Sequence, residues 1–323
     1  MNRFLEAAHK TQTARAGLIE LQTCVIAKER ALCAVFRSQF YTTENGFHRS
    51  TTNGALISYD GPEGRTTVSG ETRSQGVLPA FRDGSVLLAG TSWGLERHAG
   101  QLAPNQTWDL SFDGAWAEFA LTPNGAGRRS LLPTGESHWL SRGGTRGKIR
   151  WGSLEWDLAG ATSFLSMTTG STHFRSWRRL SATDFVSNSG EPASVEMLLL
   201  SGQQRSLGVF DRTHTRLVLR WNDETLDFPS WQALTRVEFQ SSSVTQLSWS
   251  FQRLTTRVEI EVTTSPTLAQ GYVSKDPGGF LLQRFEQLRL PVTVTLVRND
   301  KIIGRLTSHQ THLEIGNRKS PGA

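Results

Sequence analysis

The sequence predicts an all-β protein of antiparallel strands. Beyond about residue 50, apolar and polar side chains alternate with a period of two over short runs, which is the pattern of half-buried strands. Gly, Asn, Asp and Pro separate these runs, as expected for turns. The chain lacks the alternation of strands with helices of about 10 to 15 residues that a parallel sheet needs, so a parallel α/β fold is excluded.

The N-terminal segment has mixed character. Residues 3–16 contain Ala, Glu and Lys and predict a short helix. Residues 18–25 and 32–40 predict two strands joined as a hairpin through residues 28–30.

Two stretches have the composition of linkers. Residues 49–76 are rich in Gly, Ser and Thr, and residues 121–147 contain two prolines and a Gly-Gly pair. Because single cores stop growing near ~250 to 300 residues, a chain of 323 residues is expected to divide in two. The second stretch predicts that division, giving an N-terminal β domain of residues 1–145 and a C-terminal β-barrel domain of residues 146–323.

The second half contains the clearest strands. Residues 291–297 and 301–306 flank Arg298-Asn299-Asp300, which predicts a hairpin turn. Other strands are indicated by alternating apolar positions: Leu217, Leu219 and Trp221; Leu247, Trp249 and Phe251; and Val258, Ile260 and Val262.

Composition excludes several function classes. The formal charge is +6, but the basic residues are scattered and form no long stripe, so a solvated surface is favoured over nucleic-acid binding. The two cysteines match no disulfide, metal or redox motif. No apolar run approaches the ~18 residues of a membrane span, and the N-terminus lacks a signal peptide, so we expect a cytoplasmic protein.

Residues 90–94 fit the G-x-S-x-G pattern of a serine hydrolase, with Ser92 as the nucleophile. In such an enzyme a helix follows the serine directly. Here Gly100 and Pro104 leave no room for that helix, so the match is interpreted as a coincidence.

Metal and cofactor motifs are not indicated. His309 and His312 point to opposite faces of the strand predicted there, which favours two exposed polar side chains. Neither a P-loop nor a dinucleotide-binding fingerprint occurs, so no cofactor is predicted.

Ten tryptophans are the most unusual feature of the composition. Several occupy alternating strand positions, where an indole either fills a core or lines a pocket for an apolar ligand. Core packing is the more common role for any single tryptophan, and both remain open.

The layout of the middle of the chain resembles a known superfamily. The matching segments are residues 147–158, residues 166–170, and the aromatic and arginine-rich segment of residues 174–179. They resemble the superfamily that includes carotenoid hydratases, tocopherol cyclase and related tandem lipocalin-like proteins. The resemblance implies two consecutive lipocalin-like barrels or half-barrels and an apolar cavity for a hydrophobic, isoprenoid or polyketide-like small molecule.

The resemblance implies enzymes that hydrate or cyclise such ligands by protonating a double bond or by folding the substrate. The positions of the family's acidic residue and tryptophan read Ser-Met-Thr-Thr at residues 166–169. His173 and Asp184 are therefore the candidate acids, because an imidazole or a carboxyl in an apolar cavity can be tuned for proton transfer. The alternatives are a strand hydrogen bond for His173 and a turn cap for Asp184.

Arginines beside a tryptophan suggest how the ligand is held. On a strand, Arg175 and Arg179 share a face with Trp177, where a stacked guanidinium can hold a carboxylate or phenolate, while Arg178 points away. The predicted ligand-binding residues are Trp151, Trp156, Arg175, Trp177, Trp221 and Trp249.

The leading hypothesis is a protein that binds a hydrophobic small molecule and acts as an isomerase, cyclase or hydratase, or that binds the ligand without chemistry. The alternative is an all-β carbohydrate-binding or interaction module with exposed tryptophan platforms. A serine hydrolase using Ser92 ranks third.

Overall fold

The computed structural model describes residues 17–27, 32–42, 48–58, 66–75, 79–82, 85–88, 90–112, 117–120, 134–170, 174–206, 210–230, 232–243, 245–264, 270–275 and 280–319. The described elements are all β-strands, which confirms the predicted fold class. The helix expected at residues 3–16 lies outside these ranges. Within them, no helix has the length and apolar composition needed to cross a membrane.

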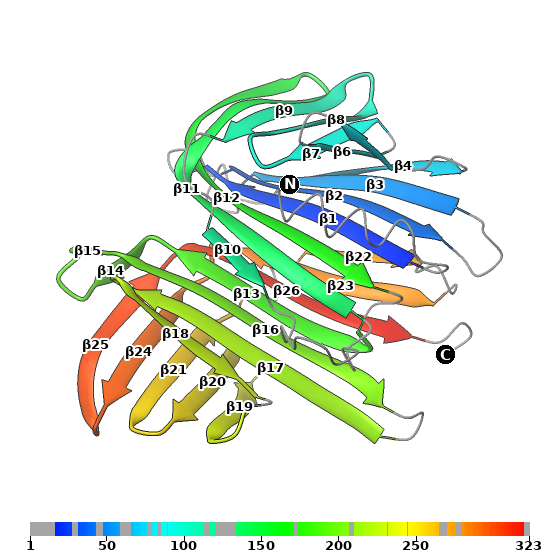
Figure 1. Cartoon of the computed structure of the whole chain (residues 1–323). Coiled ribbons are helices and arrows are strands. Elements are labelled where there is room, and N and C mark those ends of the chain that lie inside the picture. The colour runs from blue at the N-terminus through cyan, green and yellow to red at the C-terminus, as the bar shows by residue number, and fades with distance from the viewer. Residues whose placement is uncertain are drawn as a thin grey trace. The chain divides into compact units, whose positions relative to one another are not determined.

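The strands form two compact units, each described here by itself. Strands β1 to β12 belong to unit 1, and strands β13 to β26 belong to unit 2 (Figure 1). The predicted division after residue 145 falls within β11 (Thr134–Trp151), a strand of unit 1.

Unit 1 contains one antiparallel sheet that curls into a half-barrel. Its strand order is β4-β3-β2-β1-β12-β11-β9-β8-β7-β6-β5, and β10 pairs with β11. The sheet curls far enough for β8 to lie against β3 and β4, as Figure 1 shows. The strands are β1 (Gly17–Ile26), β2 (Leu32–Thr42), β3 (His48–Ser58), β4 (Thr66–Gln75), β5 (Ala80–Arg82), β6 (Ser85–Leu88), β7 (Thr91–Gly94), β8 (Arg97–Ala103), β9 (Gln106–Phe112), β10 (Ala117–Ala120), β11, and β12 (Leu154–Gly170).

The hairpin predicted near the N-terminus is confirmed by the antiparallel pair β1–β2. The linker predicted at residues 49–76 is wrong, because β3 and β4 occupy most of it. Their serines and threonines belong to the sheet: Thr52 is fully buried, and its hydroxyl bonds the hydroxyl of Ser38 over 2.8 Å. Composition misled here because hydroxyl side chains suit both loops and partly polar sheets.

The second predicted linker is also partly strand. Residues 121–133 lie outside the described residues, but residues 134–147 form the first part of β11. The register of β11 against β12 shifts twice, between Ser141 and Gly147. Gly147 has a φ of 137°, and a Cβ there would lie 2.0 Å from the carbonyl oxygen of Asp109. Gly147 therefore marks a bulge in β11 rather than a linker between domains.

Unit 2 packs two antiparallel sheets face to face. One has the order β18-β17-β16-β13-β26-β23-β22 and the other β15-β14-β25-β24-β21-β20-β19. The strands are β13 (Ser176–Thr183), β14 (Phe185–Ser187), β15 (Pro192–Ala193), β16 (Val195–Ser206), β17 (Phe210–Trp221), β18 (Glu224–Pro229), β19 (Thr235–Ser243), β20 (Gln246–Arg253), β21 (Thr256–Thr263), β22 (Gln270–Lys275), β23 (Leu281–Leu288), β24 (Val292–Arg298), β25 (Lys301–Ser308) and β26 (Gln310–Lys319).

The apolar core of unit 2 takes side chains from both sheets. Leu180, Leu199 and Leu217 come from one sheet, and Phe251 and Val294 from the other. The alternation predicted for β17, β20 and β21 is confirmed by this core, which contains the apolar positions of all three strands. The predicted C-terminal hairpin is confirmed by β24 and β25.

Candidate functional site

A buried group of charged side chains lies on one face of unit 2. Strands β13, β26 and β23 are neighbours, and Leu180 and Leu313 point from them into the apolar core. Because side chains alternate along a strand, the intervening residues lie on the opposite face. Those residues form what we call the Glu314 cluster: Trp177, Arg179, Arg284, Glu286, His312 and Glu314.

Glu314 lies at the centre of the cluster because of strand register. On β26 it is directly opposite Arg179 of β13 on one side and Glu286 of β23 on the other. Its side chain is 0% exposed. A carboxylate is expensive to bury, so this position requires partners that replace its hydration.

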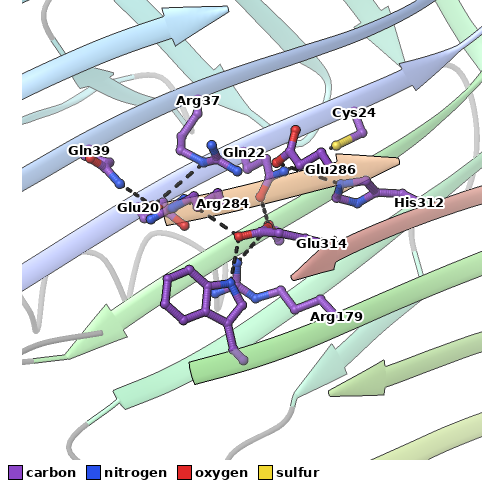
Figure 2. Close-up of polar contacts among 12 residues, drawn as sticks. Glu20, Gln22, Cys24, Arg37, Gln39, Arg179, Arg284, Glu286, His312 and Glu314 are labelled. Carbon is purple, nitrogen blue, oxygen red and sulfur yellow. Dashed lines mark hydrogen bonds and ion pairs between the residues drawn. The ribbon is translucent and has the colours of Figure 1, made fainter. Parts of the chain in front are cut away.

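Trp177 and Arg179 supply hydrogen bonds to Glu314. The indole Nε1 of Trp177 donates to Oε1 over 2.7 Å, and Nη1 of Arg179 donates to Oε2 over 2.9 Å. Nη1 of Arg284 lies 3.8 Å from Oε1, so a second guanidinium adds its charge. Figure 2 shows Arg179 and Arg284 beside the Glu314 carboxylate.

Gly316 allows the indole of Trp177 to reach Glu314. The two residues are paired across β13 and β26. A Cβ at Gly316 would lie 1.9 Å from the indole, which means that the ring lies across the glycine. The guanidinium carbons of Arg179 and Arg284 are 5.7 and 5.3 Å from the ring centre, within cation–π range.

His312 and Glu286 form a second pair in the cluster. The imidazole Nε2 lies 3.9 Å from Oε1 of Glu286, and both side chains are buried. One nitrogen or oxygen atom from each of Glu286, His312 and Glu314 lies within 4.8 Å of the others. A carboxylate beside an imidazole orients the ring and favours its protonated form.

The charges of the cluster determine which chemistry suits it. Two carboxylates and two guanidiniums already balance when His312 is neutral. A divalent cation held by Glu286, His312 and Glu314 would leave two buried positive charges without compensation within the cluster. Holding a metal ion at these three residues would therefore cost two uncompensated positive charges among the named groups of the cluster.

Unit 1 has a related but smaller group on β1 and β2. Glu20 and Gln39 are paired across the strands, as are Gln22 and Arg37, and all four are buried. Oε2 of Glu20 accepts a hydrogen bond from the Gln39 amide and lies 3.7 Å from Nε of Arg37. Figure 2 includes this group, in which one carboxylate again has a guanidinium and a neutral donor.

Comparisons with known proteins identify the fold. No family model matches the chain, and no curated protein matches its sequence. Among solved structures, kievitone hydratase from Nectria haematococca is similar, with a TM-score of 0.55 and 11% identity over 93% of this chain and 88% of that one. An AttH-like protein of Nitrosomonas europaea aligns with a TM-score of 0.46 and 14% identity over 93% and 92% of the two chains.

The chain has an all-β, lipocalin-like fold. At 11% identity this similarity concerns architecture and transfers no residue roles. The fold agrees with the architecture that the mid-chain resemblance implies, and membership of that superfamily stays a prediction.

The two predicted acids have different outcomes. His173 lies outside the described residues. Asp184 lies between β13 and β14, where the chain passes from one sheet of unit 2 to the other, and its φ is 53°. Aspartate tolerates this left-handed conformation better than most residues, so Asp184 has a structural role at the corner. Its role as a proton donor stays a prediction.

The arginine pattern around Trp177 is confirmed in part. Arg179 shares the face of Trp177 as predicted, whereas Arg175 precedes β13 and is exposed. Arg178 points the other way, and its guanidinium lies 4.5 Å above the ring of Phe239. Burial lowers the pKa of Arg178 from its ordinary value.

The other predicted tryptophans belong to the two cores. Trp151 is buried in the core of unit 1, and the partly buried Trp156 packs against it. Trp249 is buried in the core of unit 2, and Trp221 packs against that core. Their role in ligand binding stays a prediction.

Ser92 does not occupy a hydrolase elbow. It lies within β7, which pairs with β6 on one side and β8 on the other, and β8 begins at Arg97. The strand-to-helix turn that exposes a nucleophilic serine is therefore not formed at this position.

Sequence reasoning missed most of the Glu314 cluster. Trp177 was predicted, but Arg284, Glu286 and Glu314 were not, and His312 was expected to be exposed. That expectation is wrong, since His312 is 6% exposed, whereas His309 is exposed as predicted. The sequence signal for the cluster is in residues 312–316. Apolar residues alternate there with charged ones, and charged residues on a strand are normally predicted to face solvent.

Proposed function

We propose that this protein catalyses an acid–base reaction, hydration or isomerisation of a double bond, on an apolar small molecule at the Glu314 cluster. The observation that supports this proposal is the buried His312–Glu286 pair, which lies beside a carboxylate that accepts hydrogen bonds from Trp177 and Arg179. Burying five ionisable groups together lowers the stability of the fold. Such clusters are common at catalytic sites.

His312 is assigned the proton transfer. An imidazole is the side chain that titrates nearest to neutral pH, and the Glu286 carboxylate lies 3.9 Å from Nε2 of this one. In a hydration of a double bond conjugated to a carbonyl, water adds to the β-carbon while the neutral imidazole takes a proton from it. The imidazolium then gives a proton to the α-carbon, so the residues are regenerated.

Arg179 and Arg284 are assigned charge stabilisation. Glu314 fixes Arg179 by a direct hydrogen bond and attracts Arg284 across 3.8 Å. Positive groups held in place where negative charge develops lower the barrier of a reaction. They suit a substrate whose double bond is conjugated to a carbonyl, since that oxygen becomes more negative when water adds.

The substrate class follows from the fold and from the name of a structural neighbour. Lipocalin-like folds enclose apolar molecules, and the structural neighbour kievitone hydratase is by its name a hydratase. Both support an unsaturated, largely apolar substrate such as an isoprenoid or a prenylated phenol. A ligand binder without chemistry is the second candidate, favoured by the balanced charge of the cluster at rest.

Labelled water separates these two functions. Farnesol and a prenylated isoflavone are first tested for saturable binding by tryptophan fluorescence. The compounds that bind are then incubated with the protein in ¹⁸O-labelled heavy water and analysed by mass spectrometry. We expect uptake of labelled water or of deuterium at carbon, and a loss of about 100-fold or more in His312→Gln and Glu286→Gln.

The exposed His309 provides the matched control, and His309→Gln should keep the full rate. Bound compounds that gain no label over the wild-type protein would identify it as a binder. Label uptake that survives both cluster substitutions would place the chemistry elsewhere.

A further inference from the structure

Strand β19 forms one edge of a sheet in unit 2. It ends the sheet β15-β14-β25-β24-β21-β20-β19 and runs over nine residues, Thr235–Ser243. One side of it pairs with β20, beside which Figure 1 shows it, and no strand among the described residues pairs with the other side. An edge strand presents backbone N–H and C=O groups that can pair with another chain. β19 is therefore a surface on which a further strand can dock.

The apolar core of unit 2 reaches this edge and is incompletely covered there. Val237 packs against the core but is only partly buried. Phe239 is two residues further along the strand and so lies on the same face. Its ring is 5.0 Å from the ring of the buried Trp249, yet 39% of the residue is exposed. A strand added beside β19 would cover part of this apolar surface, which is favourable.

The outer face of β19 carries two opposite charges. Arg236 and Glu238 are 75% and 47% exposed, and Nη2 of the arginine lies 2.7 Å from Oε1 of the glutamate. Charged side chains, lysine above all, usually protect an edge strand from association. Like charges directly opposite each other repel, however, whereas opposite charges attract. One charge of each sign, two residues apart, makes this edge complementary to a reversed copy of itself.

Antiparallel pairing centred on Val237 brings these charges together. Each residue then lies opposite the residue of the other copy that is equally far from Val237 in the reverse direction. Arg236 of each copy therefore lies opposite Glu238 of the other. On the inner face, Thr235 lies opposite Phe239, and Val237 lies opposite itself.

The two neighbouring registers are less favourable. Centring the pair on Glu238 places two carboxylates directly opposite each other, which is destabilising. Centring it on Phe239 extends the pairing to Ser243, but the register of β19 against β20 shifts between Ser241 and Ser243. A bulge bends a strand and interrupts its pairing. The register centred on Val237 ends before that irregularity.

We propose that two copies of this chain form a dimer through antiparallel pairing of their β19 strands, centred on Val237. Both copies use the same surface, which is the arrangement of a twofold-symmetric interface. The exposed charges form cross-strand ion pairs, so salt should weaken the dimer. β19 belongs to the other sheet of unit 2 from the Glu314 cluster, and the dimer is independent of the acid–base function.

Sedimentation equilibrium of the full-length protein tests for the dimer, at concentrations of about 1 to 100 μM that suit a modest affinity. The apparent mass should rise toward twice that of the chain. Arg236→Glu places carboxylates opposite each other and should weaken the dimer about 10-fold or more. Arg257→Glu is the matched control and should keep the wild-type affinity. Nε of Arg257 lies 3.0 Å from Oε1 of Glu259 in an equally spaced pair, but on the interior strand β21.

Two variants that self-associate poorly should associate with each other. Arg236→Glu leaves only negative charge at the two positions, and Glu238→Arg leaves only positive charge. Opposite charges then face each other in the mixed pair. An equimolar mixture should therefore recover a dimer of about wild-type affinity.

A cysteine on the symmetry axis reports the register. In the proposed pairing Val237 faces itself at a Cα distance of about 4.5 to 5.5 Å, within the range of a disulfide. Val237→Cys should cross-link on oxidation, whereas Glu259→Cys on β21 should not. The native Cys24 and Cys33 are buried.

Four results would each overturn the proposal. They are a wild-type monomer throughout the concentration range, an equal loss of affinity in Arg257→Glu, no heterodimer in the mixture, and a dimer that Val237→Cys does not cross-link.

Discussion

Gly316 lies directly beneath the indole of Trp177, and no side chain fits between them. The ideal Cβ position at Gly316 is 1.9 Å from the ring. The close approach also determines where Nε1 of Trp177 points, because a ring displaced from the strand would lose its bond to Glu314. One missing side chain on β26 therefore helps to hold the carboxylate at the centre of the cluster.

Gly316→Ala should displace the indole and destabilise the protein by about 1 to 3 kcal/mol, the usual cost of overpacking. The free energy of unfolding in urea measures this loss, and tryptophan fluorescence reports the movement of the ring. Gly271→Ala is the control, because a Cβ there meets its nearest neighbour at an ordinary 3.4 Å. Equal stabilities of the two variants would contradict the close packing.

Glu314→Gln should be strongly destabilising. It removes the charge that compensates Arg179 and Arg284, and breaking one side of a buried ion pair costs about 3 to 5 kcal/mol. Glu261→Gln breaks the exposed pair with Arg305, which is 3.2 Å long, and should cost under ~1 kcal/mol. Chemical denaturation of both variants tests the difference, and a mild effect at Glu314 would mean that the cluster is open to water.

Stability should fall in acid partly because of His98. Its pKa is about 3 in the folded protein, against 6.5 for an unperturbed histidine, so below pH 6.5 the unfolded chain takes up a proton that the folded chain does not. The contribution is complete above pH 6.5 and is lost as the pH falls toward 3, with a slope of at most about 1.4 kcal/mol per pH unit.

Urea unfolding between pH 4.5 and 7.5 measures this slope. The wild type should lose stability more steeply than His98→Leu, whose side chain does not titrate. Parallel curves for the two proteins would show that the imidazole already reaches solvent in the folded state.

The β24–β25 hairpin turn depends on left-handed backbone. Asn299 and Asp300 have φ of 48° and 60°, the geometry of a tight hairpin turn. Asn299→Ala should cost about 1 kcal/mol, because alanine tolerates positive φ less well, whereas Asp300→Gly should be neutral or slightly stabilising. Thermal unfolding of both variants checks the contrast, and equal melting temperatures would argue against this turn.

The sequence was most informative where alternation is strict. Along β20 and β21 the apolar set Leu247, Trp249, Phe251, Val258 and Ile260 was read from spacing alone and lies in the core of unit 2. It was least informative where hydroxyls line a strand, as at Ser50 and Thr52, since their composition is that of a loop. Only their pairing with β2 makes them part of a sheet.

The candidate site was predicted only at Trp177. Alternation identifies two faces of a strand, and the habitual assignment of the charged face to solvent fails on β26, where both faces are buried. His312, Glu314 and Leu313 are all at most 6% exposed. No local sequence pattern indicates that the charged face of this strand is buried as well.

Local spacing thus established that this chain is built from antiparallel strands and which side chains of β17, β20 and β21 fill the core of unit 2, because side-chain direction along a strand is a local property. The assembly of Arg179, Glu286 and Glu314 came from long-range pairing, since 135 residues separate Arg179 from Glu314. The neutral tautomer of His98 also depends on tertiary structure. It requires the indole of Trp108, ten residues away across a hairpin, and the burial of both rings. Burial decides the chemistry of these groups, and burial is a property of the folded chain.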